Sequence, residues 1–171
     1  MKQSLALALI VGILTVSAVA LRAPSPVAAS SVPPCTAAQL SARIVSWSGA
    51  MGSDIANVVI VNTSFAKCSL RDLPRVELVS ASGHVLIAGV PASTSASTHG
   101  FSPLHQFKTE VEAGNYCGPA YTTPVTLAFI LPGTAGRVIA MPAGPPSVSG
   151  VPPCNGAPGS AGHISIHAWH A

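Results

Sequence analysis

The sequence predicts an all-β fold, a sandwich of about eight or nine short strands that follows an N-terminal signal helix. Behind the N-terminus, short runs of β-branched residues recur, and no stretch shows the 3.6-residue period of an amphipathic helix. The 15 glycines and 16 prolines supply turns between these runs, because neither residue suits a helix interior. Several short strands with turn signals between them are typical of a β-sandwich.

The N-terminal residues predict export. Lys2 precedes an apolar run over residues 5–21, and the tripeptide Val27-Ala28-Ala29 provides a small-residue cleavage site. A second such site ends at Ala20. The apolar run is near the shortest length that spans a bilayer, about 17 residues, so an uncleaved anchor is the alternative. We expect the protein to be held at a membrane only in that case.

Three segments follow from this interpretation. Residues 1–29 are assigned to the signal peptide, residues 30–34 to a flexible tether rich in Pro and Ser, and residues 35–171 to a single β-sandwich domain. Without Lys2 and Arg22, six Lys and Arg oppose five Asp and Glu, a net charge of +1. Nucleic-acid binding needs clustered Lys and Arg to displace counterions, and these six are scattered, so we expect no nucleic-acid partner.

The strands are predicted in chain order from β-branched runs and turn residues. Residues 75–80 alternate cleanly, with Val76 and Leu78 on one face, and Ser82-Gly83 then turns the chain into a hairpin. Residues 123–131 form the strongest candidate. The full set of predicted strands is 41–47, 56–62, 75–80, 85–87, 123–131, 137–141 and 163–169, with weaker candidates at 107–112 and around Tyr116.

Residues 91–103 predict a long exposed loop, because they are rich in Ser and Thr and poor in strand formers. Binding residues concentrate in such loops. His99 and His105 lie in or beside it and are our first candidates for a binding surface.

Four cysteines behind an export signal predict two structural disulfides in an oxidising compartment. Three pairings are open. Pairing neighbours in sequence joins Cys35 to Cys68 and Cys117 to Cys154, and closes two loops of similar length. A structural zinc site or a redox pair needs closely spaced cysteines such as C-x-x-C, which the chain lacks.

The chain also resembles a known family. The residues that carry this resemblance are a cysteine in a Pro-rich start, the run from Cys68 to Val76 (CSLRDLPRV), Asn115-Tyr116-Cys117-Gly118, the strand at 124–131, and the run from Val151 to Gly156 (VPPCNG). In this order they are similar to the domain of unknown function 4232, found in secreted or lipid-anchored proteins, chiefly of actinobacteria. The resemblance implies an immunoglobulin-like antiparallel sandwich with two disulfides. It implies no activity.

The histidines near the C-terminus raise a metal hypothesis. On a strand, His163 and His167 lie about 13 Å apart at ~3.3 Å per residue, too far to share one ion. A site could be completed by His84, His99 or His105 from elsewhere, but the favoured interpretation is that these are surface histidines, with no metal and no cofactor.

The sequence gives no strong support for a catalytic site. It contains no G-x-S-x-G elbow, and the Glu110 and Glu112 pair is better explained as a solvated strand face. Trp169 is predicted to share a face with His163 and His167, where it could stack on a sugar or cell-wall ring if that face is exposed.

The sequence therefore predicts a secreted or cell-envelope module that is not an enzyme and binds an unknown extracellular ligand. The candidate surface comprises His99, His105 and Trp169. The alternatives are a metal-dependent or hydrolytic extracellular enzyme that uses dispersed His and acidic residues, and a purely structural envelope protein.

Overall fold

Ten strands and one 3₁₀ helix make up the part of the chain that the computed structural model describes, residues 31–90, 96–133, 135–144 and 150–171. The all-β class is confirmed, and the predicted signal helix lies outside the described residues. In chain order the elements are η1 (Ala37–Gln39), β1 (Leu40–Ala50), β2 (Ser53–Asn62), β3 (Cys68–Arg71), β4 (Arg75–Val79), β5 (Val85–Ala88), β6 (Thr98–Phe101), β7 (Gln106–Gly114), β8 (Thr126–Ile130), β9 (Arg137–Pro142) and β10 (His163–Ile166).

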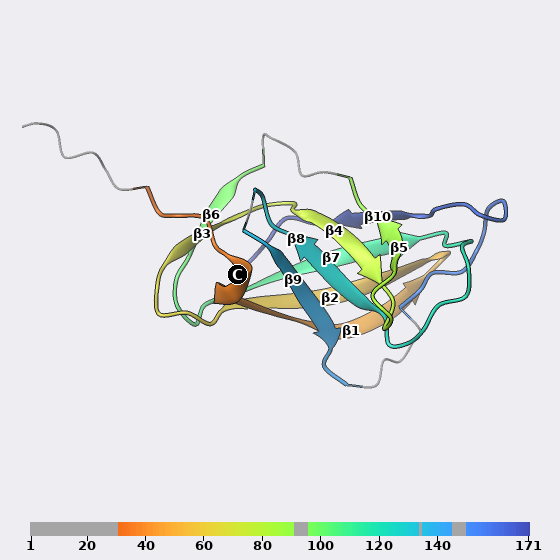
Figure 1. Cartoon of the computed structure of the whole chain (residues 1–171), viewed down its shortest axis with the longest axis horizontal. Coiled ribbons are helices and arrows are strands. Elements are labelled where there is room, and N and C mark those ends of the chain that lie inside the picture. The colour runs from red at the N-terminus through yellow and green to blue at the C-terminus, as the bar shows by residue number, and fades with distance from the viewer. Residues whose placement is uncertain (1–30, 91–95, 134, 145–149) are drawn as a thin grey trace, which may run out of the picture. The chain divides into compact units, whose positions relative to one another are not determined.

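Eight strands form one strongly curled sheet (Figure 1). Their order is β10-β7-β2-β1-β9-β8-β4-β5, and the edge strand β10 lies close to β4 and β5 at the other edge, so the sheet nearly closes into a barrel. Neighbouring strands are antiparallel except β1 and β9, which run parallel. Strands β3 and β6 form a separate two-stranded sheet. The immunoglobulin-like sandwich is not confirmed, because hydrogen bonds join eight strands into a single sheet.

Alternation of apolar and polar residues explains which side of the large sheet is filled. On β2, Ala56, Val58 and Ile60 are buried at every second position and face the interior, as the two-residue period of a strand requires. Phe129 of β8 and Phe101 of β6 are also fully buried. Each such large side chain contributes about 1.5–3 kcal/mol to stability. The compact unit 31–171 holds this whole core and both disulfides, so we expect it to fold independently of the preceding residues.

The predicted loop at 91–103 requires a correction. Residues 98–101 form strand β6, which pairs with β3 so that Cys68 lies opposite Phe101 and Leu70 opposite His99. Two buried side chains on β3 and one on β6 hold these short strands against the core, although their other residues are polar. Residues 91–95 lie outside the described part of the chain.

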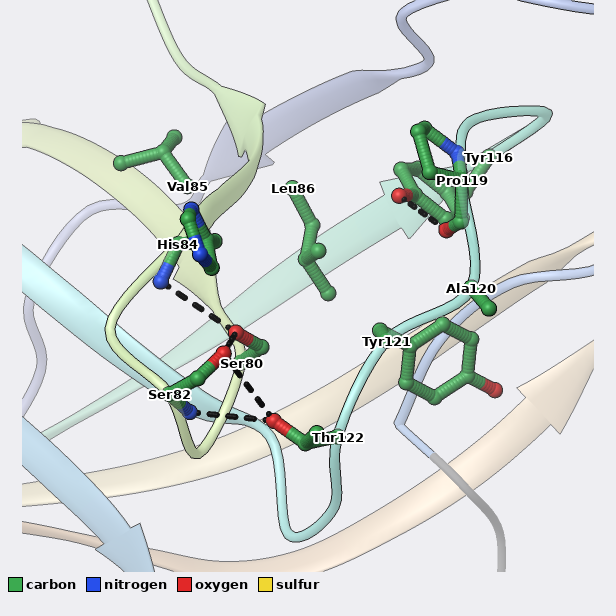
Figure 2. A pocket seen from close by; sticks show the side chains of 10 residues that line it. All are labelled: Ser80, Ser82, His84, Val85, Leu86, Tyr116, Pro119, Ala120, Tyr121 and Thr122. Carbon is green, nitrogen blue, oxygen red and sulfur yellow. Dashed lines mark hydrogen bonds between the residues drawn. The ribbon is translucent and has the colours of Figure 1, made fainter.

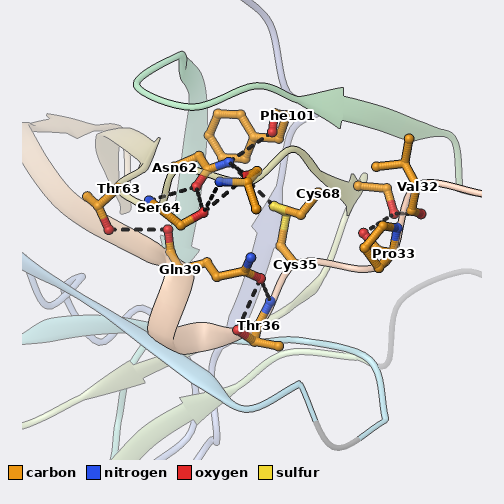
Figure 3. The surroundings of a disulfide bond; sticks show 12 residues. Val32, Pro33, Cys35, Thr36, Gln39, Asn62, Thr63, Ser64, Cys68 and Phe101 are labelled. Carbon is orange, nitrogen blue, oxygen red and sulfur yellow. Dashed lines mark hydrogen bonds between the residues drawn. A yellow bond between two sulfur atoms is a disulfide. The ribbon is translucent and has the colours of Figure 1, made fainter.

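Both disulfides join neighbouring cysteines in sequence, Cys35 with Cys68 and Cys117 with Cys154, which confirms the pairing of sequence neighbours among the three possible pairings. The first is buried and fixes the start of the domain beside β3, where the Ser69 amide donates to the carbonyl of Pro33 (Figure 3). The second joins the loop after β7 to the segment that precedes β10 and is more exposed. Within the described residues, the chain has no helix of the length and apolar character needed to span a bilayer.

Candidate ligand-binding site

A pocket of about 370 Å³ opens between the β4–β5 turn and the loop that follows β7 (Figure 2). Its volume is at the lower end of the range of small-molecule sites, about 300–1,000 Å³. Hydroxyl groups and His84 line one side, and aromatic and apolar side chains line the other. The lining residues are Ser80, Ser82, His84, Val85, Leu86, Tyr116, Pro119, Ala120, Tyr121 and Thr122.

Three hydroxyl groups from two segments form a hydrogen-bonded cluster. The oxygens of Ser80 and Ser82 are 2.9 Å apart, and the Thr122 hydroxyl lies 3.2 Å from that of Ser82. The backbone amide of Ser82 donates to Thr122 Oγ1, and the amide of His84 donates to Ser80 Oγ. Because a hydroxyl has one donor and two acceptor sites, this cluster retains capacity for a ligand.

The local sequence explains why the turn holds this cluster. Gly83 has a φ of +85°, which glycine adopts without a steric penalty and which closes the tight turn between β4 and β5. A backbone hydrogen bond from Ala81 to the carbonyl of Thr122 joins this turn to the opposite loop. The two walls of the pocket are therefore held at a fixed separation.

Two tyrosines form the aromatic wall. Tyr116 is buried, and its hydroxyl donates to the carbonyl of Pro119 at 2.8 Å. Tyr121 packs edge-on against the Tyr116 ring, with ring centres 6.1 Å apart. Gly118 is required here, because a Cβ at this position would lie 2.6 Å from the Tyr116 ring. Cys117 anchors the same loop through its disulfide with Cys154.

The side chains of the lining determine what the pocket can do chemically. Among the described residues, no Asp, Glu, Lys, Arg or Cys lines the pocket, and the nitrogen that contacts Ser80 Oγ is the backbone amide of His84. Nucleophilic catalysis needs a side-chain base within hydrogen-bond reach of the hydroxyl, oriented by a third group. The lining offers hydroxyl groups, the His84 side chain and aromatic rings.

The structure places the predicted surface residues elsewhere. His99, on β6, is part-exposed, and its Nε2 lies 2.7 Å from the buried carboxylate of Asp72. His105 is exposed in the turn before β7, where its carbonyl accepts from the Asn62 amide. Neither residue lines the pocket.

Trp169 must be removed from the predicted surface. It is 5% exposed, packs on Phe129 and donates from its indole nitrogen to the carbonyl of Arg71 at 3.2 Å. Its backbone amide donates to Asp72 Oδ1. The prediction assumed a strand to residue 169, but β10 ends at Ile166, so the alternation that placed Trp169 with His163 does not reach it.

Of the residues that the structure describes, no three His, Cys, Asp or Glu side chains come together as a metal-binding group. His84 lines the pocket, whereas His99 is paired with Asp72.

The pocket was not predicted from the sequence, although two local signals were present. Tyr116 and Tyr121 flank a Gly-Pro pair in a disulfide-bonded loop, and Ser80-Ala81-Ser82-Gly83-His84 is a hydroxyl-rich turn. Only the pairing of these two distant segments makes a site of them.

Comparisons with known proteins identify the family. Neither the search of curated proteins nor the search of solved structures found a match. A scan against family models matches residues 35–170 to a domain of unknown function, DUF4232, which covers both disulfides and every strand described above. The chain belongs to this family, DUF4232.

Proposed function

We propose that this protein is an exported, non-catalytic module that binds a neutral, hydroxyl-rich ligand, a saccharide, in the pocket between the β4–β5 turn and residues 116–122. The observation that carries the proposal is the lining itself, with hydrogen-bonding hydroxyls facing an aromatic wall. A sugar ring presents hydroxyls at its edge and C–H groups on its faces. It therefore matches both sides of the pocket.

Export is supported by two independent features. The N-terminal pattern of Lys2, an apolar run and small residues is that of a cleaved signal peptide. Two disulfides persist only where thiols are oxidised, which favours the extracellular space or the cell envelope. We accordingly assign the binding function to the outside of the cell, with the envelope as the source of the ligand.

The absence of Arg, Lys, Asp and Glu from the described lining supports a neutral ligand. Anionic ligands are usually recognised by Arg or Lys. Tyr121 and Leu86 offer apolar surface, and the Ser80, Ser82 and Thr122 hydroxyls offer orientation. The ligand class that fits is one with many hydroxyls and no formal charge.

Isothermal titration with diacetylchitobiose, the neutral disaccharide of N-acetylglucosamine, tests the proposal. Tyr121→Ala removes the ring face, and we expect at least a tenfold weaker Kd, or about 1.4 kcal/mol. Met141→Ala is the matched control, since Met141 is exposed and lies outside the pocket lining. Equal affinity in the two variants, or release of monosaccharide during the titration, would contradict a non-catalytic site at this position.

A further inference from the structure

Two loops at one end of the barrel share a single anchor, Asn62 (Figure 3). Its backbone carbonyl accepts from the amide of Leu104 at 2.8 Å, and its amide donates to the carbonyl of His105. Its side-chain amide donates to the carbonyls of Ala66 and Phe101 at 2.8 and 2.9 Å. Residues 62–67 and residues 101–106, here called the two tip loops, are therefore held in one fixed arrangement.

Each tip loop carries one large apolar side chain that projects into solvent. Phe65 is 101% exposed and Leu104 is 78% exposed. Leu104 also has a φ of +60°, a conformation that a branched side chain rarely adopts and that Gly or Asn would adopt with less strain. Scattered exposed apolar residues are ordinary, but here two lie on loops fixed by the same residue.

The charges nearby are positive. Lys67 is exposed in the first tip loop, and neither loop contains Asp or Glu. On the outer face of the sheet, Arg43 of β1 and Lys108 of β7 are the strand partners of Val59 on its two sides. Val59 lies three residues before Asn62 on β2. The side chains of Arg43 and Lys108 are both exposed. The loops and the adjoining face thus present cations around the apolar tips.

The opposite end of the same three strands has the reverse charge. Glu112 lies there, and the exposed Glu110 is the next outward-facing residue of β7 after Lys108, whereas Asp54 is buried. Residues 48–56 and 111–114 contain no Lys or Arg. This asymmetry orients the tip loops toward a negative surface. Phosphate groups would meet the cations, and the acyl region behind them would accept Phe65 and Leu104.

We propose that the two tip loops dock this protein on an anionic phospholipid bilayer, with Phe65 and Leu104 inserted and Lys67, Arg43 and Lys108 at the headgroups. A second copy of the chain is the less suitable partner. Specific protein interfaces bury about 1,200–2,000 Å², and two isolated side chains on narrow loops offer far less.

The experiment is co-sedimentation of residues 31–171 with vesicles of phosphatidylcholine and phosphatidylglycerol, compared with phosphatidylcholine alone. We expect binding to the anionic vesicles that weakens with salt and falls at least tenfold in the double variant Phe65→Ser with Leu104→Asn. Met51→Ser is the control, because Met51 is 108% exposed on the β1–β2 turn at the opposite end. It should bind as the unmodified protein does.

A second readout keeps the proposal testable if the double variant is unstable. In Phe65→Trp, the new indole should shift to the blue on vesicle addition and be quenched by brominated acyl chains, whereas the native Trp47 and Trp169 are buried. Equal binding to neutral vesicles, no quenching at position 65, or loss of a dimer in the double variant by sedimentation velocity would each overturn the proposal.

Discussion

Asn62 is buried, and each polar atom of its side chain has a hydrogen-bond partner. Its Nδ2 donates to two backbone carbonyls, and its Oδ1 accepts from the amide and hydroxyl of Ser64 at 3.0 and 2.7 Å. A buried polar group with all its hydrogen bonds made holds its surroundings rigidly. If one of its partners is removed, the unpaired group lowers the stability of the folded state. This single residue thereby fixes both tip loops.

Asn62→Asp replaces the donor of two hydrogen bonds with a buried acceptor. The carbonyls of Ala66 and Phe101 would then face a carboxylate, and we expect the free energy of unfolding to fall by about 3 kcal/mol in urea titrations. Gln106→Glu makes the same amide-to-carboxylate change at an exposed position of β7 and should cost less than about 0.5 kcal/mol. Similar losses in the two variants would mean that Asn62 is not the anchor.

Asp54 makes the free energy of unfolding depend on pH. Burial raises the pKa of its carboxyl above the ordinary value of 3.8, so between that value and the raised pKa the folded state holds a proton that the unfolded chain has released. Its stabilising contribution is fully present below pH 3.8 and is lost as the pH rises through the raised pKa. Asp54→Asn should therefore gain stability relative to the unmodified protein as the pH increases from 4 to 7. A gain that grows toward acid pH would contradict this assignment.

At the scale of elements, the sequence predicted those strands that bury a regular series of apolar residues. The predicted ranges 56–62, 75–80 and 137–141 lie within or closely overlap β2, β4 and β9. Strands β3 and β6 could not be predicted, because each has four residues and is held by one or two buried side chains among Ser, Arg, Thr and His. The parallel pairing of β1 with β9 is a contact between distant segments, which periodicity does not encode.

One buried carboxylate, that of Asp72, contributes to holding the C-terminal segment after β10, alongside backbone hydrogen bonds from this segment to Lys108 and Glu110. Asp72 bonds to the Trp169 amide through one oxygen and to His99 through the other. We expect Asp72→Ala to lower the free energy of unfolding by about 1.5–3 kcal/mol, because it removes the carboxylate that accepts from the buried Trp169 amide and contacts the part-exposed His99. The control is Glu110→Ala, whose carboxylate lies 4.0 Å from His167 at an exposed position and should contribute less than about 1 kcal/mol. Amide exchange at residues 167–170 should accelerate only in the Asp72 variant.

For the whole molecule, the two disulfides have different accessibilities. Cys35 and Cys68 are buried, whereas Cys154 is exposed and Cys117 is partly so. Each closes a loop of similar length, with separations of 33 and 37 residues, and each should contribute about 3–4 kcal/mol by restricting the unfolded chain. The two disulfides should therefore contribute similar amounts to the stability of the fold, but only the Cys117–Cys154 bond lies close to the surface.

Mild reduction of the folded protein should separate their roles. Dithiothreitol followed by alkylation and peptide mass analysis should label Cys117 and Cys154 first, because a thiolate must reach the sulfur that it attacks. Loosening the loop around Tyr116 should weaken saccharide binding and leave vesicle binding unchanged. Earlier labelling of Cys35, or loss of both activities together, would show that the two ends of the domain are not independent.

The candidate site shows what a sequence alone leaves open. The hydroxyl-rich turn at Ser80 and the tyrosine pair can both be seen in the sequence. Ser80 and Tyr116 are 36 positions apart, however, and only the folded sheet brings them to one pocket. Trp169 was visible too, and its burial depends on where β10 ends rather than on residue type. Residues that can bind a ligand can be recognised from the local sequence, but the fold decides which of them come together in one pocket.

The most direct test of saccharide binding is a ¹⁵N–¹H correlation spectrum of residues 31–171 during titration with diacetylchitobiose. We predict saturable shifts at the amides of residues 80–86 and 116–122, with little change around Asn62 and Asp72. Shifts that gather at His99 and His105 instead, or a spectrum that does not change at millimolar disaccharide, would contradict the assignment of this pocket as the functional site.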